Sequence, residues 1–469
     1  MLLAAGELAA AFMPRARGPV AGLVQRVIDT TPPPMIDFGV ATVRTADKIL
    51  LRTTVIAECL ALGAALPARG SRASRQPGWR RPAFVALTAA AAMVVDRSKL
   101  RRLDAKRKAR AVGRAPPSDG NLPIPGISPL YTPNDSFYVT DVAARPARID
   151  PDAWRLRVHG MVERPLELAL DDIESLGLEE LDATLVCVHN PVGGDRIGSA
   201  RWAGVPLERI LDAAGVRAGA EQVLARSVDD FTAGVPLEWV RSGAPALLAI
   251  GMNGEALPFE HGFPARLLVP GLWGADANTK WLAELELTTW DAVSDYWDRR
   301  GWPRQPSFVQ PSSRIDVPTN RAVLEPGANA VAGVAWAPPE GIEGVEVRID
   351  DGEWRPAELG EEVAPTMWRQ WRLDWDAEPG EHMLRVRAIG RSRRQPDGPE
   401  PPYPVGSRGY DEHRVTVAPG SDRQRQTGRA AVDDVRDRVV LGVRGLKAWR
   451  DRGYPPTPQF PPPQASSGK

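Results

Sequence analysis

The stretch LVCVHNPVGGDRIGSARWAGVPL contains the residues of this chain that are best placed to do chemistry. Cys187 is followed by His189 and Asn190, and then by Gly193 and Gly194. The apolar run ATLVCVH predicts a buried strand that includes the cysteine. The glycines predict a turn after it, in which backbone N–H groups can approach a ligand closely. A thiolate presented in this way is a nucleophile or a ligand for a soft metal.

Three interpretations of Cys187 are open on these residues alone. An unpaired cysteine in a strand is often a small buried hydrophobic residue. A thiol hydrolase needs contact between Cys187 and His189, and side chains at positions i and i+2 of a strand touch only if the strand is distorted. A metal-bound thiolate needs no such contact, and His189 is then a proton donor or a structural histidine.

A second cluster of candidate ligand-binding residues lies in MNGEALPFEHGFPARLLVPGLWGADANTKWLAELEL. It brings His261, Arg266 and Lys280 together with several glycines and with tryptophans that include Trp281. Fixed cations and backbone donors bind a phosphate, and aromatic faces bind a planar heterocycle. The alternative is an ordinary basic loop with structural tryptophans. A shorter stretch, RSVDDFTAGVP, adds Asp229, Phe231 and Thr232 on a predicted turn. Taken alone, this stretch is weaker evidence for a ligand-binding site.

The composition excludes several classes of protein. Lys plus Arg and Asp plus Glu both total 59, so the chain has no global basic field of the kind that concentrates nucleic acid. The two cysteines, Cys59 and Cys187, cannot form a disulfide framework or a four-thiolate zinc site. The 46 prolines, 43 glycines and 15 tryptophans favour many turns and aromatic-walled pockets, and therefore a β-rich body.

The 469 residues divide into regions of different composition and sequence pattern, and the length has room for two or three domains. Residues 1–118 contain three apolar runs that are too short or too charged for a clean membrane span, followed by a strongly basic stretch. We expect a helical region here that associates with a membrane, its sidedness open, or alternatively a soluble chain that is cytoplasmic or exported. Residues 420–469 predict one helix and then a disordered Pro-rich end.

The middle of the chain predicts two folded units. Residues 119–308 combine short strands with a capped helix in LALDDIESL, which indicates a mixed α+β domain. Residues 309–419 give regularly spaced strands, RIDVP, NAVAGVAW, VEVRIDDGEW, RQWRLDW and HMLRVRAI, separated by turn signals such as Asp351-Gly352. This spacing predicts an antiparallel sandwich.

Four stretches, in this order, resemble the sulfite oxidase family of molybdenum enzymes: TLVCVHN, SARWAGVPL, LLAIGMNGEALPFEHGFPARLLVPG and TKWLAELEL. The resemblance extends over about residues 131–419. It implies an α+β fold, with a mixed α/β molybdopterin-binding catalytic domain at 119–308 and an immunoglobulin-like dimerisation domain at 309–419. It also implies a molybdenum cofactor-dependent oxidoreductase that uses molybdenum and molybdopterin and forms a homodimer.

The resemblance assigns roles to individual residues. Cys187 is the protein thiolate that binds molybdenum, and the other sulfur ligands come from the dithiolene of a single molybdopterin. His189, beside the metal ligand, is the candidate proton donor. His261, Arg266 and Lys280 match positions that hold the pterin and its phosphate in that family. The full set of predicted cofactor-binding residues is Tyr138, Asn190, Asp229, Phe231, Thr232, His261, Arg266, Lys280 and Trp281.

The sequence departs from sulfite oxidases where those enzymes bind their substrate. Arginines follow the Cys-x-x-Asn motif there, whereas Pro191 and Val192 stand here. Ile250 replaces a pocket tyrosine, and Thr140, Asp141 and Val142 replace Arg-Asn-His. Each lost charged hydrogen bond is worth roughly 1.5 to 3 kcal/mol. We therefore expect a substrate other than sulfite, a less charged oxo donor or acceptor such as a sulfoxide.

The electrons of such a reaction need an outside partner. No pair of histidines suited to clamp a haem is evident among the five in the chain, so we expect a separate electron-transfer protein or a quinone. The main rival is a non-catalytic binding or scaffolding protein that keeps the fold. Asp230 and Asn278 add polar character near the predicted cofactor site and leave this rival open.

Overall fold

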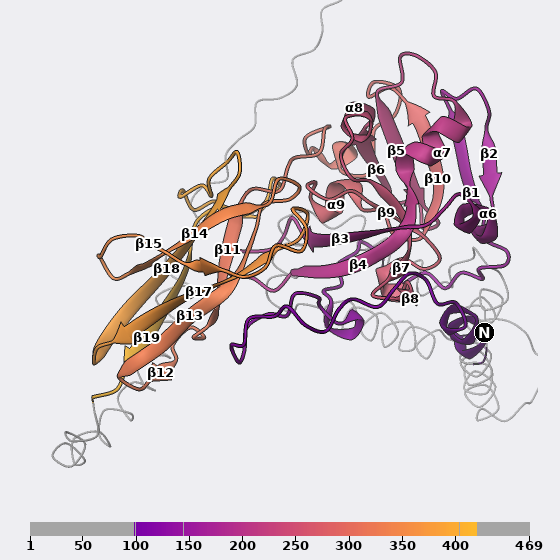
Figure 1. The fold of residues 1–469 in the computed structure, drawn as a ribbon. Coiled ribbons are helices and arrows are strands. Elements are labelled where there is room, and N and C mark those ends of the chain that lie inside the picture. The colour runs from indigo at the N-terminus through magenta and orange to yellow at the C-terminus, as the bar shows by residue number, and fades with distance from the viewer. Residues whose placement is uncertain (1–97, 99, 144, 403, 420–469) are drawn as a thin grey trace, which may run out of the picture.

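The computed structural model describes residues 98, 100–143, 145–402 and 404–419, which form two β-rich bodies (Figure 1). The first body contains two sheets flanked by short helices, and the second contains two further sheets. The first body comprises η1 (Asn134–Ser136), β1 (Leu156–Gly160), β2 (Leu166–Leu168), α6 (Leu170–Ser175), β3 (Glu179–Val186), β4 (Ile197–Pro206), α7 (Leu207–Ala214), β5 (Gln222–Ser227), β6 (Thr232–Pro236), α8 (Leu237–Arg241), β7 (Leu247–Met252), β8 (Glu255–Ala256), η2 (Phe259–His261), β9 (Arg266–Leu268), α9 (Gly274–Ala277), β10 (Leu282–Thr288) and η3 (Asp298–Arg300).

One sheet of the first body has the strand order β2-β1-β10-β5-β6. Only β1 and β10 run parallel in it. The first strand buries Leu156 and Val158 and exposes Arg157 between them, as alternation predicts. Helix α7 buries residues spaced three and four apart, including Leu207 and Leu211, and ends at Gly215, whose φ of 69° suits glycine.

The second sheet of the first body carries the predicted chemistry. Its order is β3-β4-β7-β8, and β9 pairs with β7. The last four residues of β3 are all buried, and so are most of those in β4. Both faces of these strands are therefore covered, which explains the continuous apolar run before Cys187.

The second body is a sandwich of two sheets, β11-β13-β17-β16 and β12-β19-β18-β14-β15. One core cluster contains Val331 and Trp371 from the first of these sheets and Val345, Leu384 and Val415 from the second. The five predicted strands are confirmed as β11, β13, β14, β17 and β18. Its strands are β11 (Ser312–Val317), β12 (Val323–Leu324), β13 (Gly327–Trp336), β14 (Ile342–Ile349), β15 (Arg355–Pro356), β16 (Glu358–Leu359), β17 (Arg369–Ala377), β18 (Gly380–Gly390) and β19 (Asp411–Val417).

The basic stretch before residue 119 differs from the linker that its charge suggests. Residues 100–108 are helical, and Leu103 and Val112 belong to the core cluster of the first body. The guanidinium of Arg107 is buried and donates to the carbonyl oxygen of Ala256 at 3.0 Å. The folded part thus reaches to the N-terminal side of residue 119, because this helix has an apolar side that packs against the sheet.

In the part of the chain that the structure describes, no helix is long and apolar enough to cross a bilayer. The predicted apolar runs within residues 1–97 and the predicted tail from 420 lie outside the described residues.

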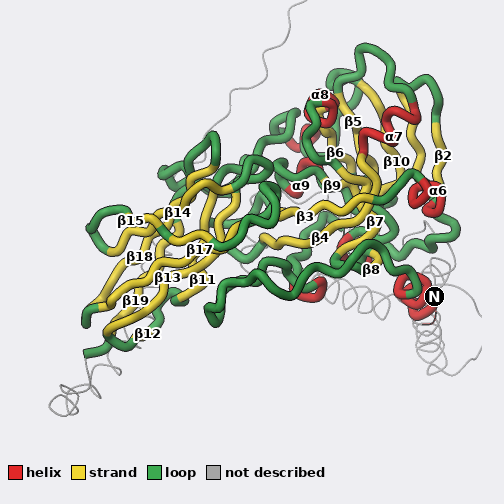
Figure 2. The backbone as a smooth tube through the Cα atoms, viewed as in Figure 1, coloured by secondary structure: helices red, strands yellow, loops and turns green. Residues whose placement is uncertain are grey.

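The two bodies meet along a shared apolar cluster. Val186, Val188 and Trp302 of the first body pack there with Trp336 and Trp368 of the sandwich. Figure 2 shows loop segments, in green, where the sandwich meets β3 and β4. This contact lies beside the end of β3, where Cys187 follows.

Candidate functional site

Cys187 lies in a turn at the end of β3. The strand ladder stops at the pair Val186 and Ile197, so the prediction that the strand includes the cysteine is wrong by one residue. The Cys187 N–H donates to the carbonyl oxygen of Arg196 at 3.0 Å, and its own carbonyl accepts from the Asn190 N–H at 2.9 Å. The side chain is 4% exposed. A rigid strand thus delivers the thiol to a tight, buried turn.

The turn brings His189 against the thiol. Burial raises the pKa of Cys187, but hydrogen bonds and positive charge from His189 outweigh it, so the thiol pKa lies below its usual value. The Thr140 hydroxyl also hydrogen-bonds to the sulfur. The departure from strand geometry that this contact requires is therefore present. The sulfur is prepared to carry negative charge, as both a nucleophile and a metal ligand require.

Tyr138 connects the thiol with the basic part of the site. A Cβ placed on Gly274 would lie 3.2 Å from the Tyr138 hydroxyl oxygen and 3.1 Å from the Val186 carbonyl oxygen. Glycine at the start of α9 thus allows this helix to approach the Cys187 turn. Burial raises the pKa of Tyr138, the Cys187 thiolate raises it further, and Arg266 opposes both.

Arg266 is a buried cation without a carboxylate partner among the described residues. It begins β9, is 4% exposed, and donates to the carbonyl oxygens of His261 and Asn278 at 3.2 and 3.4 Å. Its guanidinium carbon lies 5.1 Å from the ring centroid of Trp202, and its Nε has no hydrogen-bond partner within the described part of the chain. Burial lowers its pKa to about 10. A buried charge without a counterion is costly, so this position suits an anionic ligand.

Further buried polar atoms of the predicted ligand-binding stretches have no hydrogen-bond partner in the described structure. They are Nε1 of Trp273, Nδ2 of Asn278 and the hydroxyls of Thr279 and Thr232. Each such atom costs about 1 to 3 kcal/mol, and they are rare in folded proteins. Together with the Arg266 guanidinium, these atoms fit a polar, anionic ligand such as molybdopterin with its phosphate.

His261 and Lys280 flank Arg266 and differ in charge. The His261 Nε2 donates to the Asn134 carbonyl oxygen at 3.1 Å, and burial, followed by Lys280 and Arg266, lowers the imidazole pKa to about 3. The Lys280 Nζ donates to the Glu260 carbonyl oxygen at 2.8 Å and lies 3.4 Å from Asp141 Oδ2. His261 is therefore neutral near pH 7, and Asp141 offsets part of the lysine charge.

The turn between β5 and β6 joins the same site. The Val228 N–H donates to the Trp281 carbonyl oxygen at 3.0 Å, which places the predicted turn residues Asp229, Phe231 and Thr232 beside Trp281. The Phe231 N–H donates to Asp229 Oδ1 at 3.4 Å. The Trp281 indole donates to the Phe259 carbonyl oxygen at 2.7 Å.

An aromatic chain links this turn back to the Cys187 turn. The ring centroids of His189 and Trp302 are 6.2 Å apart, and Trp302 stacks on Trp297 at 4.2 Å. Trp297 lies 6.4 Å from Phe231, and its indole donates to the Ala275 carbonyl oxygen in α9. The structure thus brings all three predicted stretches together.

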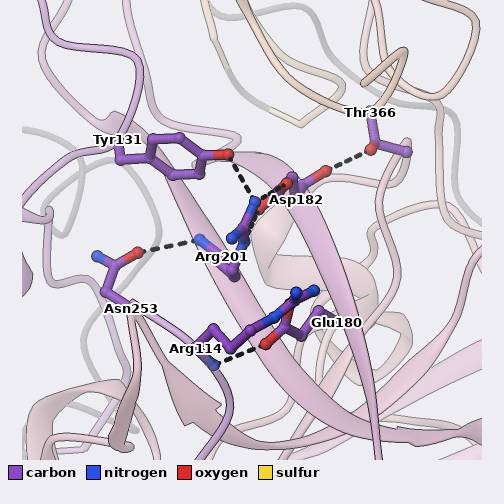
Figure 3. A network of polar contacts seen from close by, with 7 residues as sticks. All are labelled: Arg114, Tyr131, Glu180, Asp182, Arg201, Asn253 and Thr366. Carbon is purple, nitrogen blue, oxygen red and sulfur yellow. Dashed lines mark hydrogen bonds and ion pairs between the residues drawn. The ribbon is translucent and has the colours of Figure 1, made fainter. Parts of the chain in front are cut away.

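A polar network that no sequence motif indicates fixes β3 against β4 (Figure 3). The Arg201 Nε and Nη2 each donate to a carboxylate oxygen of Asp182 at 2.9 Å, and Arg201 also contacts the Tyr131 hydroxyl at 3.2 Å. The Arg201 N–H donates to Asn253 Oδ1 at 3.0 Å. The stretches SARW and MNG contain two of these residues, but nothing in their spacing indicates the contact.

The His261 pKa leads to a prediction on stability. The unfolded imidazole titrates near 6.5 and the folded one at about 3, so the unfolded state binds more protons between these values. The contribution of His261 to the free energy of unfolding should therefore be constant above pH 6.5. It should decrease as the pH is lowered, by about 2 to 4 kcal/mol at pH 4. Urea unfolding of cofactor-free protein checks this, with His261→Gln as the control. An equal pH dependence in the two proteins would contradict it.

Comparisons with known proteins agree with this geometry. The family model of the oxidoreductase molybdopterin binding domain matches residues 142–297. Sulfite oxidase of Gallus gallus is 31% identical over 320 residues, which cover 58% of this chain and 69% of that protein. Mitochondrial sulfite oxidase of Mus musculus is 32% identical over 336 residues, 61% of each chain. The uncharacterized oxidoreductase YuiH of Bacillus subtilis is 30% identical over 176 residues, which cover 38% of this chain and 85% of that protein.

A solved structure supports the fold. The sulfane dehydrogenase SoxCD of Paracoccus pantotrophus matches with a TM-score of 0.55 at 22% identity, covering 68% of this chain and 92% of that one. The buried basic site and these relatives lead to one conclusion. The chain belongs to the sulfite oxidase family and is a molybdenum cofactor-dependent oxidoreductase with molybdopterin.

Proposed function

We propose that this enzyme transfers an oxygen atom at a molybdenum bound by Cys187, and that its substrate carries less charge than sulfite. The observation that carries the substrate proposal is the composition of the Cys187 turn. Pro191 and Val192 follow Asn190 where sulfite-binding arginines are expected, and Ile250 is a buried apolar residue. The nearby Arg196 donates to the His189 carbonyl oxygen at 3.2 Å. A small dianion would find few of the bidentate cations that it needs.

The unpaired buried donors support the assignment of the cofactor-binding residues. Arg266, with Lys280 beside it, would bind the phosphate of molybdopterin, and the indole of Trp273 and the amide of Asn278 would donate to its polar edge. When bound, molybdenum on molybdopterin supplies two-electron oxygen-atom transfer. Asn190 would act by holding the turn, because its Oδ1 accepts from the Arg196 N–H at 2.8 Å.

His189 is the proposed proton carrier of the site. It hydrogen-bonds to the Cys187 sulfur, and its ring lies edge-on to Trp302 in a half-buried position. A histidine next to the metal ligand can give a proton as oxygen leaves as water. The same contact would suit a Cys–His nucleophile. Iodoacetamide separates the two: a metal-bound Cys187 resists alkylation, whereas a catalytic thiol reacts and loses activity.

Sulfite turnover tests the substrate proposal. The loss of about two charged contacts predicts a kcat/KM for sulfite roughly 100- to 10,000-fold below that of the Gallus gallus enzyme measured alongside. Pro191 is exposed, so Pro191→Arg should recover at least about tenfold, while Asp195→Arg, farther along the turn, should recover little. A sulfite kcat/KM equal to that of the Gallus gallus enzyme would refute the proposal. A low sulfite kcat/KM would support the proposal and make the reduction of methyl sulfoxides the next assay.

The remaining assignments are proposals on the same footing. We assign residues 119–308 to the catalytic domain and 309–419 to an immunoglobulin-like dimerisation domain, which predicts a dimer in sedimentation. An external one-electron protein or a quinone would complete the redox cycle. The apolar runs within residues 1–97 would supply membrane association, which fractionation of the expressing cells would test.

A further inference from the structure

Two side chains of the second body, the β-sandwich, form hydrogen bonds with the backbone of the turn that contains Cys187. The Arg314 Nη1, from β11, donates to the carbonyl oxygen of Gly194 at 2.8 Å. The Ser407 hydroxyl, from the segment before β19, donates to the carbonyl oxygen of Asn190 at 2.6 Å. Both acceptors are backbone groups of the turn itself. Two residues more than a hundred positions away in the sequence thus fix the backbone on either side of the Pro191–Gly193 segment.

Arg314 is itself held rigidly. Its Nε donates to Asp316 Oδ1 at 2.8 Å, and its Nη2 donates to the Ser128 hydroxyl at 2.6 Å. Asp316 closes the cycle by accepting from the Ser128 N–H at 2.9 Å. The side chains of Arg314 and Asp316 are 12% and 9% exposed. A guanidinium with three fixed partners in a nearly dry site has little freedom to move, so it can define the position of the Gly194 carbonyl.

Asp411 packs against the turn at a position that only glycine allows. Gly193 has a φ of 68°, and a Cβ on it would lie 2.3 Å from Asp411 Oδ1. The other carboxylate oxygen of Asp411 accepts from the Ile315 N–H at 2.8 Å, and the side chain is 8% exposed. The first residue of β19 therefore lies directly against the bare backbone of the turn.

We infer that Arg314, Ser407 and Asp411 of the sandwich are positioning residues for the Cys187 site. A turn with two glycines has many conformations in isolation. Hydrogen bonds within this turn, such as that from the Gly194 N–H to the Pro191 carbonyl oxygen at 2.9 Å, restrain part of it. The sandwich adds restraints from outside, at the carbonyl oxygens of Asn190 and Gly194. The effect on catalysis rests on the proposed role of Cys187 at the metal, whereas the restraint of the turn does not.

Hydrogen exchange of the full chain tests the restraint. In Arg314→Ala, peptides that cover residues 188–196 should exchange at least about tenfold faster than in the unsubstituted chain. Arg369→Ala is a matched control, because the Arg369 guanidinium also donates to two backbone carbonyls, those of Gly360 and Ile342, within the sandwich. It should leave this turn unchanged. If Arg314→Ala fails to fold, Ser407→Ala gives the same comparison.

Steady-state kinetics and absorption spectra test whether the restraint of the turn affects catalysis. Loss of a direct outer-shell partner of a metal ligand typically costs 10- to 100-fold. Arg314 and Ser407 bind the turn rather than the Cys187 side chain, so Arg314→Ala and Ser407→Ala should lower kcat by a smaller factor, up to about 10-fold, with KM little changed. The visible absorption of the metal site should shift. Ser407→Thr, which keeps the hydroxyl, should stay close to the unsubstituted enzyme.

Equal exchange of residues 188–196 in Arg314→Ala, Ser407→Ala and the unsubstituted chain would overturn the inference. That outcome can be recognised whatever the metal content. An unsubstituted protein without molybdenum or pterin would instead refute the proposed ligand role of Cys187, and the exchange result would still decide whether the sandwich positions the turn.

Discussion

Cys187→Ser should reduce kcat by more than about 100-fold while leaving the protein folded. Loss of an outer-shell partner alone costs 10- to 100-fold in metal sites, so loss of the ligand itself should cost more. Serine is close in volume to cysteine, and Cys187 lies in a turn whose restraints are backbone hydrogen bonds. The free energy of unfolding should therefore change by only about 1 kcal/mol. Steady-state kinetics and urea unfolding measure the two quantities.

The other cysteine supplies the control for this substitution. Cys59→Ser removes the same chemical group from a position with no predicted role, and its kcat should equal that of the unsubstituted enzyme. Unchanged kcat in Cys187→Ser would remove Cys187 from the chemistry. Full loss of activity with normal metal content and an unaltered absorption spectrum would favour a thiol nucleophile over a metal ligand.

Arg266→Met should weaken cofactor binding by about 100- to 10,000-fold and make the cofactor-free protein more stable. A phosphate would receive about two charged hydrogen bonds from this guanidinium, each worth roughly 1.5 to 3 kcal/mol, so affinity should fall about 100- to 10,000-fold. In the absence of the cofactor the guanidinium is a buried charge whose acceptors among the described residues are carbonyl oxygens. Methionine of similar length removes that cost, and the free energy of unfolding should rise by about 1 kcal/mol or more.

Arg201→Met is the matched contrast for Arg266→Met. Arg201 is also largely buried, at 17% side-chain exposure, but it forms a bidentate pair with Asp182. Its removal leaves a carboxylate unpaired, so it should destabilise the protein by about 1 to 3 kcal/mol. The amount of pterin released from the purified variants measures cofactor binding. Thermal unfolding of the cofactor-free variants measures their stability. A loss of stability in Arg266→Met as large as that in Arg201→Met would contradict the assignment of an anion site.

Much of the site could be predicted because its residues are neighbours in the sequence. His261, Arg266 and Lys280 lie within one short stretch that folds around β9, so their proximity follows from the chain itself. The sandwich strands were also predictable, since each presents one face to a core and therefore alternates, as β18 does around Leu384 and Val386. The residue at which β3 ends could not be predicted, because an apolar run does not show which residue forms the last pair of the strand ladder.

Contacts between distant segments account for what the sequence did not reveal. Arg314 and Asp411 look like ordinary polar strand residues, and their place against Gly194 and Gly193 depends on how the sandwich packs on the first body. The helix at residues 100–108 was hidden by its charge, since its apolar residues are few. The hydroxyl of Thr279 becomes informative only once burial shows that it has no partner.

X-ray absorption at the molybdenum edge tests the central claim most directly. The purified full chain, expressed in a host that makes molybdopterin, should contain close to one molybdenum and one pterin per protomer. Its metal should carry one more sulfur ligand than the metal of Cys187→Ser, while Cys59→Ser should match the unsubstituted chain. The same sulfur count with and without the Cys187 thiol, in a protein loaded with metal, would contradict ligation by Cys187.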